Sequence, residues 1–217
     1  MLGLVPSAVF NNPGQAVYST MFSSILLISA LFPFVSCDST AAQSLAAQFS
    51  LTTSTSIPFP TTTMSSLDSQ SYIVSKWSLS KGRIQNGPNN LAFIKDPFPT
   101  PSASSSNETG PVLEVTYPQG SFSHDTGGTQ LYSLWNSSDG NAFRSMLVTY
   151  EVAFDSNFNW VKGGKLPGLK GGPVVDGCDG GKKTNGTDCF TTRRMWRKNA
   201  NGEGMLHGIR LLRLFIY

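Results

Sequence analysis

The sequence has little charge, and its first third has no positive charge at all. Charged residues make up 13% of the 217 residues, whereas 14 Phe, 6 Tyr and 4 Trp supply ample apolar area. This composition excludes a coiled coil and a charge-driven disordered chain. Because no apolar run reaches 18 residues, we expect no membrane-spanning helix. The net charge of +3 is too small to indicate a nucleic-acid ligand.

Positive charge is confined to the later part of the chain. Lys76 is the first basic residue, so all 16 Lys and Arg residues lie within the last 142 positions. The part of the protein that we expect to be ordered and to face a ligand is therefore more basic than the overall composition indicates.

The first 71 residues are typical of a targeting segment followed by a linker. Residues 25–35 (ILLISALFPFV) form a short apolar run before small residues, which favours a secretory signal within residues 1–37. Met21, just before this run, is an alternative start to Met1, and a buried strand or helix is the alternative interpretation of the run. Residues 38–71 are rich in Ser, Thr, Ala and Gln, which predicts a flexible linker that is a candidate for O-glycosylation.

Sequons and cysteines also favour a secreted, extracellular protein, which we expect to be a monomer. Three Asn-x-Ser/Thr sequons lie in polar stretches and predict N-glycosylation of Asn107, Asn136 and Asn185. Cys178 and Cys189 are expected to form a disulfide in an oxidising compartment. Zinc binding by these cysteines is the weaker alternative, because His124 and His207 lack ligand spacing.

Residues 72–204 are predicted to form one all-β domain, an antiparallel β-sandwich of the jelly-roll type. Short runs rich in β-forming residues alternate with Gly, Pro, Asn and Ser clusters, and helical periodicity is not evident. We therefore expect no substantial helix. The candidate strands are residues 72–79, 91–95, 112–117, 130–135, 143–154 and 190–198.

The candidate strand at residues 190–198 carries the clearest functional signal. Alternation predicts that Phe190 and Trp196 point into the core. Thr191, Arg193 and Arg197 then share the opposite face. Two guanidinium groups on one sheet face suit a ligand with carboxylates, which Arg binds bidentately. The alternative is a solvated outer face with ordinary surface arginines.

Further cations precede this strand. In residues 160–169 (WVKGGKLPGL), Lys162 and Lys165 flank a Gly pair and precede a Leu-Pro-Gly turn, so a shaped backbone holds them. The phosphate-loop, Gly-x-Ser-x-Gly and His-Glu-x-x-His patterns are absent from the sequence. His124, in a Gly- and Ser-rich turn, is a candidate base, although a single loop histidine is more often structural.

These motifs in combination resemble the polysaccharide lyase family 14 domain of fungi, and they are similar to the neighbouring glucuronan lyase family. The resemblance covers about residues 71–203 and is carried by YPQGSFSHDTGG, YEVAFDSNFNWVKGG, VKGGKLPGL and CFTTRRMWRK. It implies a β-jelly-roll whose concave face binds acidic polysaccharide. It also implies β-elimination at uronic acid residues, in which cations neutralise the carboxylate and a base removes the C5 proton.

The resemblance implies roles for individual residues. Lys165 matches the family's essential lysine, with Lys162 as second choice, and Arg193 matches the family's arginine. Thr191 stands where the family usually has serine, and Arg194 stands where it usually has an apolar residue. The predicted catalytic residues are Lys165, Thr191 and Arg193, and the predicted substrate-binding residues are Lys162, Arg197 and His124.

The C-terminal part departs from the family pattern. After Gly202-Glu203-Gly204 the family continues into a strand with a catalytic tyrosine pair, whereas this chain reads MLHGIRLLRLFIY from residue 205. We therefore expect residues 205–217 to be an atypical tail, the jelly roll to be incomplete at its C-terminus, and turnover to be weak or absent.

Three functional hypotheses follow. The first is a secreted lyase-like protein that cleaves alginate or glucuronan by β-elimination, the second is a noncatalytic module that binds acidic polysaccharide, and the third is a nonfunctional fragment. The expected partner is an anionic polyuronate, with neither nucleic acid nor stable membrane insertion. We expect no cofactor and no assignable metal site. The sequence leaves open whether a structural calcium ion is bound. The 13 acidic residues show no calcium-loop spacing that would assign its ligands.

Overall fold

A computed structural model describes residues 5–11, 39–97, 110–123, 125–136, 143, 145–174, 178, 185–208 and 215–216. Strands in mostly antiparallel sheets predominate among these residues and helices are few, which agrees with the expected all-β class. Among the described residues, no helix has both the length and the apolar content that a membrane crossing needs.

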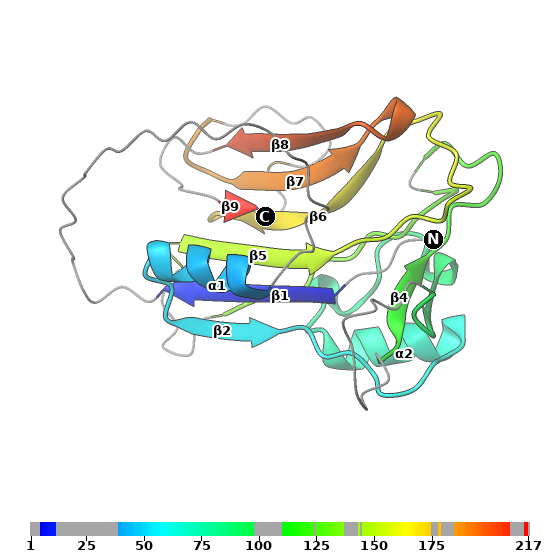
Figure 1. The fold of residues 1–217 in the computed structure, drawn as a ribbon, viewed down its shortest axis with the longest axis horizontal. Helices are drawn as coiled ribbons and strands as arrows, with labels where there is room; N and C mark the ends of the chain where they lie inside the picture. The colour runs from blue at the N-terminus through cyan, green and yellow to red at the C-terminus, as the bar shows by residue number, and fades with distance from the viewer. Residues whose placement is uncertain are drawn as a thin grey trace.

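The described strands form three sheets. The first has the order β2 (Thr53–Ser56), β1 (Val5–Asn11), β5 (Ser145–Glu151) and β9 (Phe215–Ile216), and its β5–β9 pair is parallel. The second is the antiparallel pair β3 (Leu91–Ile94) and β4 (Val112–Val115). The third has the order β6 (Gly164–Gly171), β7 (Phe190–Trp196) and β8 (Gly202–Gly208), with antiparallel neighbours. In the view of Figure 1, the third sheet lies above the first.

Two α-helices occur where the sequence analysis expected none. They are α1 (Ser39–Gln48) and α2 (Ser66–Lys76), and the shorter 3-10 turns are η1 (Ser80–Gly82), η2 (Pro88–Asn90) and η3 (Lys198–Ala200). The predicted strand at residues 72–79 is therefore wrong, because α2 continues to Lys76. The side-chain oxygen of Ser65 accepts a hydrogen bond from the Asp68 N–H at 3.2 Å and caps the start of the helix.

The segment that we expected to be a flexible linker, residues 38–71, contains α1, β2 and the first half of α2. Burial accounts for this order: Ser69 is fully buried, and its hydroxyl oxygen accepts a hydrogen bond from the Phe93 N–H at 2.9 Å. Residues 5–11, which we assigned to the upstream segment, form β1 and pair with β5. The predicted signal run at residues 25–35 lies outside the described residues.

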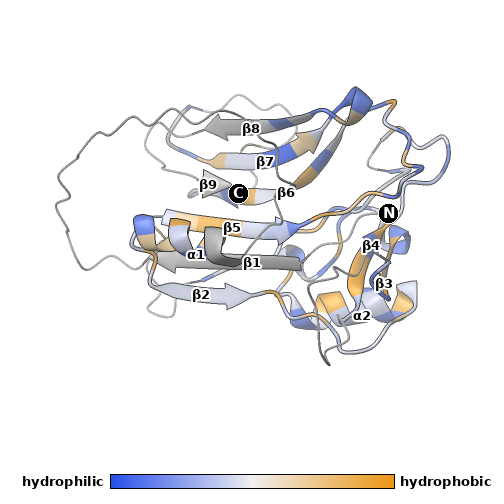
Figure 2. Ribbon diagram, viewed as in Figure 1, coloured by the Kyte–Doolittle hydropathy of each residue, from blue (hydrophilic) through white to orange (hydrophobic). Residues whose placement is uncertain are grey.

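The main core lies between α2 and the β3–β4 pair. Figure 2 shows the apolar residues gathered on these elements. Phe93 is fully buried and makes edge-to-face contacts with Phe59, Tyr72 and Trp77 at centroid distances of 5.4, 5.5 and 6.1 Å. Leu166 of β6 packs against the same cluster, so the core also supports the third sheet. The buried members of the cluster are Ile73, Trp77, Leu79, Ile84, Leu91, Phe93, Leu113 and Val115.

The predicted disulfide between Cys178 and Cys189 is confirmed. The two Cα atoms are 5.8 Å apart, within the normal range for such a bond. The bridge closes the loop that leads into β7 and stabilises the fold by about 2–3 kcal/mol through the unfolded chain. It therefore tethers the start of the strand that carries Thr191 and Arg193.

Candidate functional site

The central strand β7 brings the predicted catalytic residues onto one face of the third sheet. In the register, Lys165 of β6 lies opposite Met195, and His207 of β8 lies opposite Thr191. Residues directly opposite in a pair of strands share a face, and Thr191, Arg193 and Met195 share one by alternation. Lys165 and Arg193 are thus diagonal neighbours on this face, which we call the Arg193 face.

A β-bulge makes this arrangement possible. Lys165 and Gly168 are an odd number of residues apart, so in a regular strand they would lie on opposite faces. The register shifts between them, which leaves Leu166 and Pro167 together opposite Arg194 and returns Gly168 to the Arg193 face. Pro167 has no N–H to donate, so a bulge is the position in a sheet that tolerates it.

The two β7 residues predicted to be catalytic are both well enclosed. Thr191 is only 7% exposed, and Arg193 is half-buried. The Nε atom of Arg193 is buried and has no hydrogen-bond partner among the described residues. A buried donor without a partner is costly, so this guanidinium is suited to a ligand that brings an acceptor.

On the opposite face of β7, Trp196 is buried as the sequence predicts, whereas Phe190, also predicted to point into the core, is half-buried and Arg194 is exposed. The Trp196 ring is 6% exposed and contacts the rings of Tyr117, Phe154 and Phe158 at centroid distances of 5.4, 5.6 and 6.0 Å. The ring also covers the Cα of Gly164, where an added Cβ would overlap the indole atoms. The Gly pair before Lys165 is therefore needed for packing as well as for the turn.

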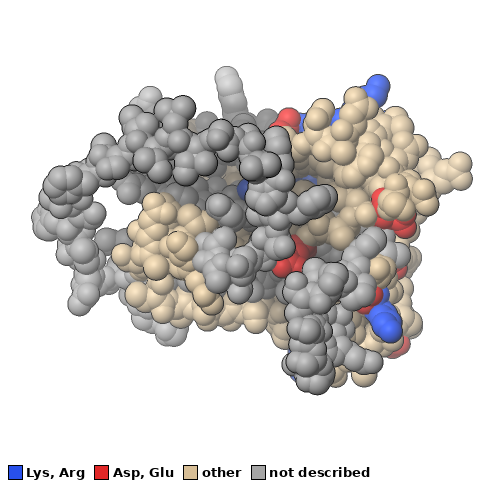
Figure 3. Space-filling view, viewed as in Figure 1, with Lys and Arg blue, Asp and Glu red and all other residues tan. Residues whose placement is uncertain are grey.

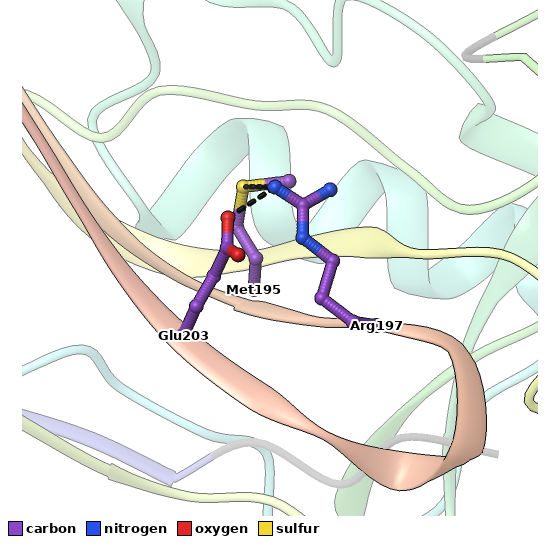
Figure 4. Close-up of polar contacts among 3 residues, drawn as sticks. All are labelled: Met195, Arg197 and Glu203. Carbon is purple, nitrogen blue, oxygen red and sulfur yellow. Dashed lines mark hydrogen bonds and ion pairs between the residues drawn. The ribbon is translucent and has the colours of Figure 1, made fainter.

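Arg197, which the sequence predicts to bind substrate, is already paired with a carboxylate in this structure. Its Nη2 donates to Oε1 of Glu203 in a close ion pair and lies 3.7 Å from Sδ of Met195 (Figure 4). The hydrogen bond with Glu203 raises the pKa of Arg197, and the same bond lowers the pKa of Glu203. Both side chains are exposed, so an incoming anion has access to compete with Glu203.

The sequence alone does not indicate Glu203, because its contact with Arg197 depends on how β7 and β8 align. The register pairs Glu203 with Met195, and this brings the carboxylate beside Arg197. We also expected no family-like strand after Gly204, whereas β8 pairs with β7 from Gly202 to Gly208. A third strand therefore borders the Arg193 face.

Two further lysines lie over aromatic rings. Nζ of Lys162 is 5.9 Å from the ring centroid of Phe122, and Nζ of Lys170 is 5.1 Å from that of Tyr132. Lys170 lies opposite Thr191 in the register, and the sequence analysis did not select it. His124, the remaining predicted substrate-binding residue, lies outside the described residues.

Two half-buried tyrosines are poor candidates for a base at neutral pH. Burial raises the pKa of both Tyr117 and Tyr150 to about 12, and in Tyr150 the charge of Arg194 partly opposes the rise. Both phenols are therefore protonated near pH 7. The Tyr150 hydroxyl donates to the carbonyl of Pro167 at 3.2 Å, so this residue holds the bulge next to Lys165.

Two of the three predicted glycosylation sites lie within the described residues. Asn136 and Asn185 are both exposed, whereas Asn107 lies outside the described residues. The Asn185 side-chain oxygen accepts hydrogen bonds from the N–H and the hydroxyl of Thr187 at 2.8 and 2.9 Å. This turn leaves the Asn185 side chain at the surface of the disulfide loop.

Charged side chains are few on the described surface. In Figure 3 most of the described surface is tan, with blue side chains near the turn between β7 and β8 and at the lower right, and a few red ones. Within the described part of the chain, no three His, Cys, Asp or Glu side chains come together to hold a metal ion. The Arg193 face, which carries Lys165 and Arg193, is suited to binding an anion.

Comparison with known proteins points to the same part of the chain. Residues 105–207 match the family model described as Polysaccharide lyase 14. The match includes β4, β5, β6, β7 and all but the last residue of β8, and thus Lys165, Thr191 and Arg193. It indicates a polysaccharide lyase-like function. No curated protein and no solved structure matches this chain.

Proposed function

We propose that this protein binds a polyuronate such as alginate or glucuronan on the Arg193 face and cleaves it by β-elimination. The observation that carries the proposal is the placement of Lys165, Thr191 and Arg193 on one face of the sheet. The family match over residues 105–207 and the unpartnered Nε of Arg193 support it.

The chemistry accounts for the cations. The C5 proton of a uronate is a weak acid, because its removal places negative charge next to an ionised carboxylate. Arg193 and Lys165 pair with this carboxylate and stabilise the enolate-like charge that develops on it. The C5–H electron pair then forms the C4–C5 double bond, the C4–O bond breaks, and the leaving oxygen takes up a proton.

The reaction also needs a group that takes the C5 proton, and we propose His207. The β7–β8 register, which pairs His207 with Thr191, supports this assignment. Imidazole is the side chain whose unperturbed pKa, about 6.5, suits a base near neutral pH. His207 thereby takes the role that the family resemblance gives to a tyrosine.

Turnover of polyuronates tests this proposal. Purified protein is incubated with alginate, with glucuronan and with a neutral glucan, and unsaturated sugar ends are followed by ultraviolet absorbance. We expect product from a polyuronate only. Replacement His207→Gln is expected to lower the rate by roughly 10²- to 10⁴-fold, whereas Lys76→Gln has no effect. Full activity of the His207→Gln variant would remove His207 from the mechanism.

The second candidate function is a noncatalytic module for acidic polysaccharide. It is favoured by the absence of tyrosine from residues 202–208, where β8 borders the Arg193 face. Binding of polyuronate without any unsaturated product, at every pH tested, would establish this function in place of the lyase. Failure to bind any polyuronate would contradict both.

We further propose that the protein is secreted and N-glycosylated. The disulfide is compatible with an oxidising compartment, and Asn136 and Asn185 are exposed.

A further inference from the structure

Phe122 presents an aromatic ring to solvent from the loop that follows β4. The residue is 72% exposed, although large aromatic side chains normally bury most of their area. Its loop is ordered by hydrogen bonds, because the N–H groups of Phe122 and Ser123 both donate to Oγ1 of Thr126, at 3.0 and 3.1 Å. The ring is thus held outward by its own turn and not by packing.

A cation from another segment accompanies the ring. Lys162, in the loop between β5 and β6, places its ammonium 5.9 Å from the Phe122 ring centroid. Its neighbour Val161 is 57% exposed, which extends the apolar surface beside the charge. An exposed flat ring with an adjacent ammonium combines an apolar platform with an anion-binding group.

The Phe122–Lys162 platform is connected to the Arg193 face through neighbouring residues. Lys162 precedes Gly163, and the side chain of Arg197 lies so close to Gly163 that an added Cβ would be 3.2 Å from its Nη1. Arg197 in turn contacts Met195, which is opposite Lys165 in the register. Residues that are adjacent in the chain or paired in the sheet therefore lead from the platform through Arg197 to Lys165.

We propose that Phe122 and Lys162 form a subsite for a uronate residue outside the cleaved bond. This inference rests on the proposed function and names the part of the polymer that each group binds. The C–H face of the sugar ring packs on Phe122 and buries apolar area, while the sugar carboxylate pairs with Lys162. A neutral sugar makes only the first of these contacts, so the subsite selects for uronate.

Dependence of binding on chain length tests the subsite. Dissociation constants of uronate oligomers of increasing length are measured by calorimetry for wild type, Phe122→Ala and Lys162→Gln. We expect each variant to bind long oligomers roughly tenfold more weakly and to bind the shortest oligomer that wild type binds with unchanged affinity. Phe122→Trp, which keeps an aromatic face, should retain the affinity of wild type for long oligomers.

The controls separate failure of the subsite from failure of the proposed function. Leu67→Ala removes an apolar side chain of equal exposure from α2, and Lys76→Gln removes an exposed charge from the end of the same helix; neither should change binding. Wild-type affinity of Phe122→Ala for long oligomers would overturn the subsite. If wild type bound a neutral glucan as tightly as it binds uronate oligomers, the proposed selectivity of the subsite for uronate would be overturned. If wild type binds no uronate oligomer of any length, the proposed function itself fails.

Discussion

Replacing Arg193 by alanine is expected to lower kcat/KM for polyuronate by roughly 10²- to 10³-fold. The reason is that Arg193 faces Lys165 diagonally across β6 and β7 and has a buried Nε without a partner among the described residues. A substrate carboxylate would complete this arrangement, and its loss leaves the developing negative charge to Lys165 alone. Steady-state kinetics by ultraviolet absorbance measure the effect. Arg193→Lys, which keeps the charge but not the bidentate geometry, should be intermediate.

The neighbouring arginine provides a matched control for this variant. Arg194 has the same side chain one residue further along β7, but it lies on the opposite face, where its charge acts on Tyr150. Arg194→Ala should therefore change kcat/KM by less than about threefold in correctly folded protein. Equal losses of activity in the two variants would contradict the assignment of the Arg193 face.

Replacing Trp196 by alanine is expected to reduce the free energy of unfolding by about 3–5 kcal/mol. Trp196 is buried, and its indole contacts Tyr117 and Phe154 as well as covering Gly164. Removing the indole leaves a cavity that the surrounding rings cannot fill without moving. Urea denaturation followed by circular dichroism measures the change.

The control for this prediction is Trp160→Ala. The ring centroid of Trp160 also lies 4.6 Å from that of Phe154, but Trp160 is half-buried. Its replacement should therefore reduce the free energy of unfolding by less than that of Trp196. A loss of less than about 1 kcal/mol for Trp196→Ala would show that β7 does not depend on this cluster.

The sequence predicts the strands that alternate strongly and misses the elements whose signal is weak. The regions of β3, β4, β5 and β7 are all predicted, and the inward position of Trp196 is confirmed. Helix α2 is missed because aromatic and β-branched residues near its end, such as Tyr72 and Ile73, favour a strand prediction. Its cap at Ser65 lies within the stretch whose composition predicts a linker.

The sequence predicts which residues form the candidate site, but it does not predict how they are arranged in space. The spacing of Thr191 and Arg193 predicts a shared face, whereas the place of Lys165 on that face depends on the bulge at Leu166 and Pro167. The ion pair of Arg197 depends on the β7–β8 register. These features arise between strands, so a single sequence carries no direct signal for them.

The central claim is that uronate binds the Arg193 face, and hydrogen exchange tests it without requiring turnover. Amide exchange is measured by mass spectrometry with and without a saturating uronate oligomer. We predict slower exchange in peptides that contain β6 and β7 (164–171 and 190–196), with no change in β3 and β4 (91–94 and 112–115). Protection confined to the β3–β4 pair or to α2, with β6 and β7 unchanged, would contradict the claim.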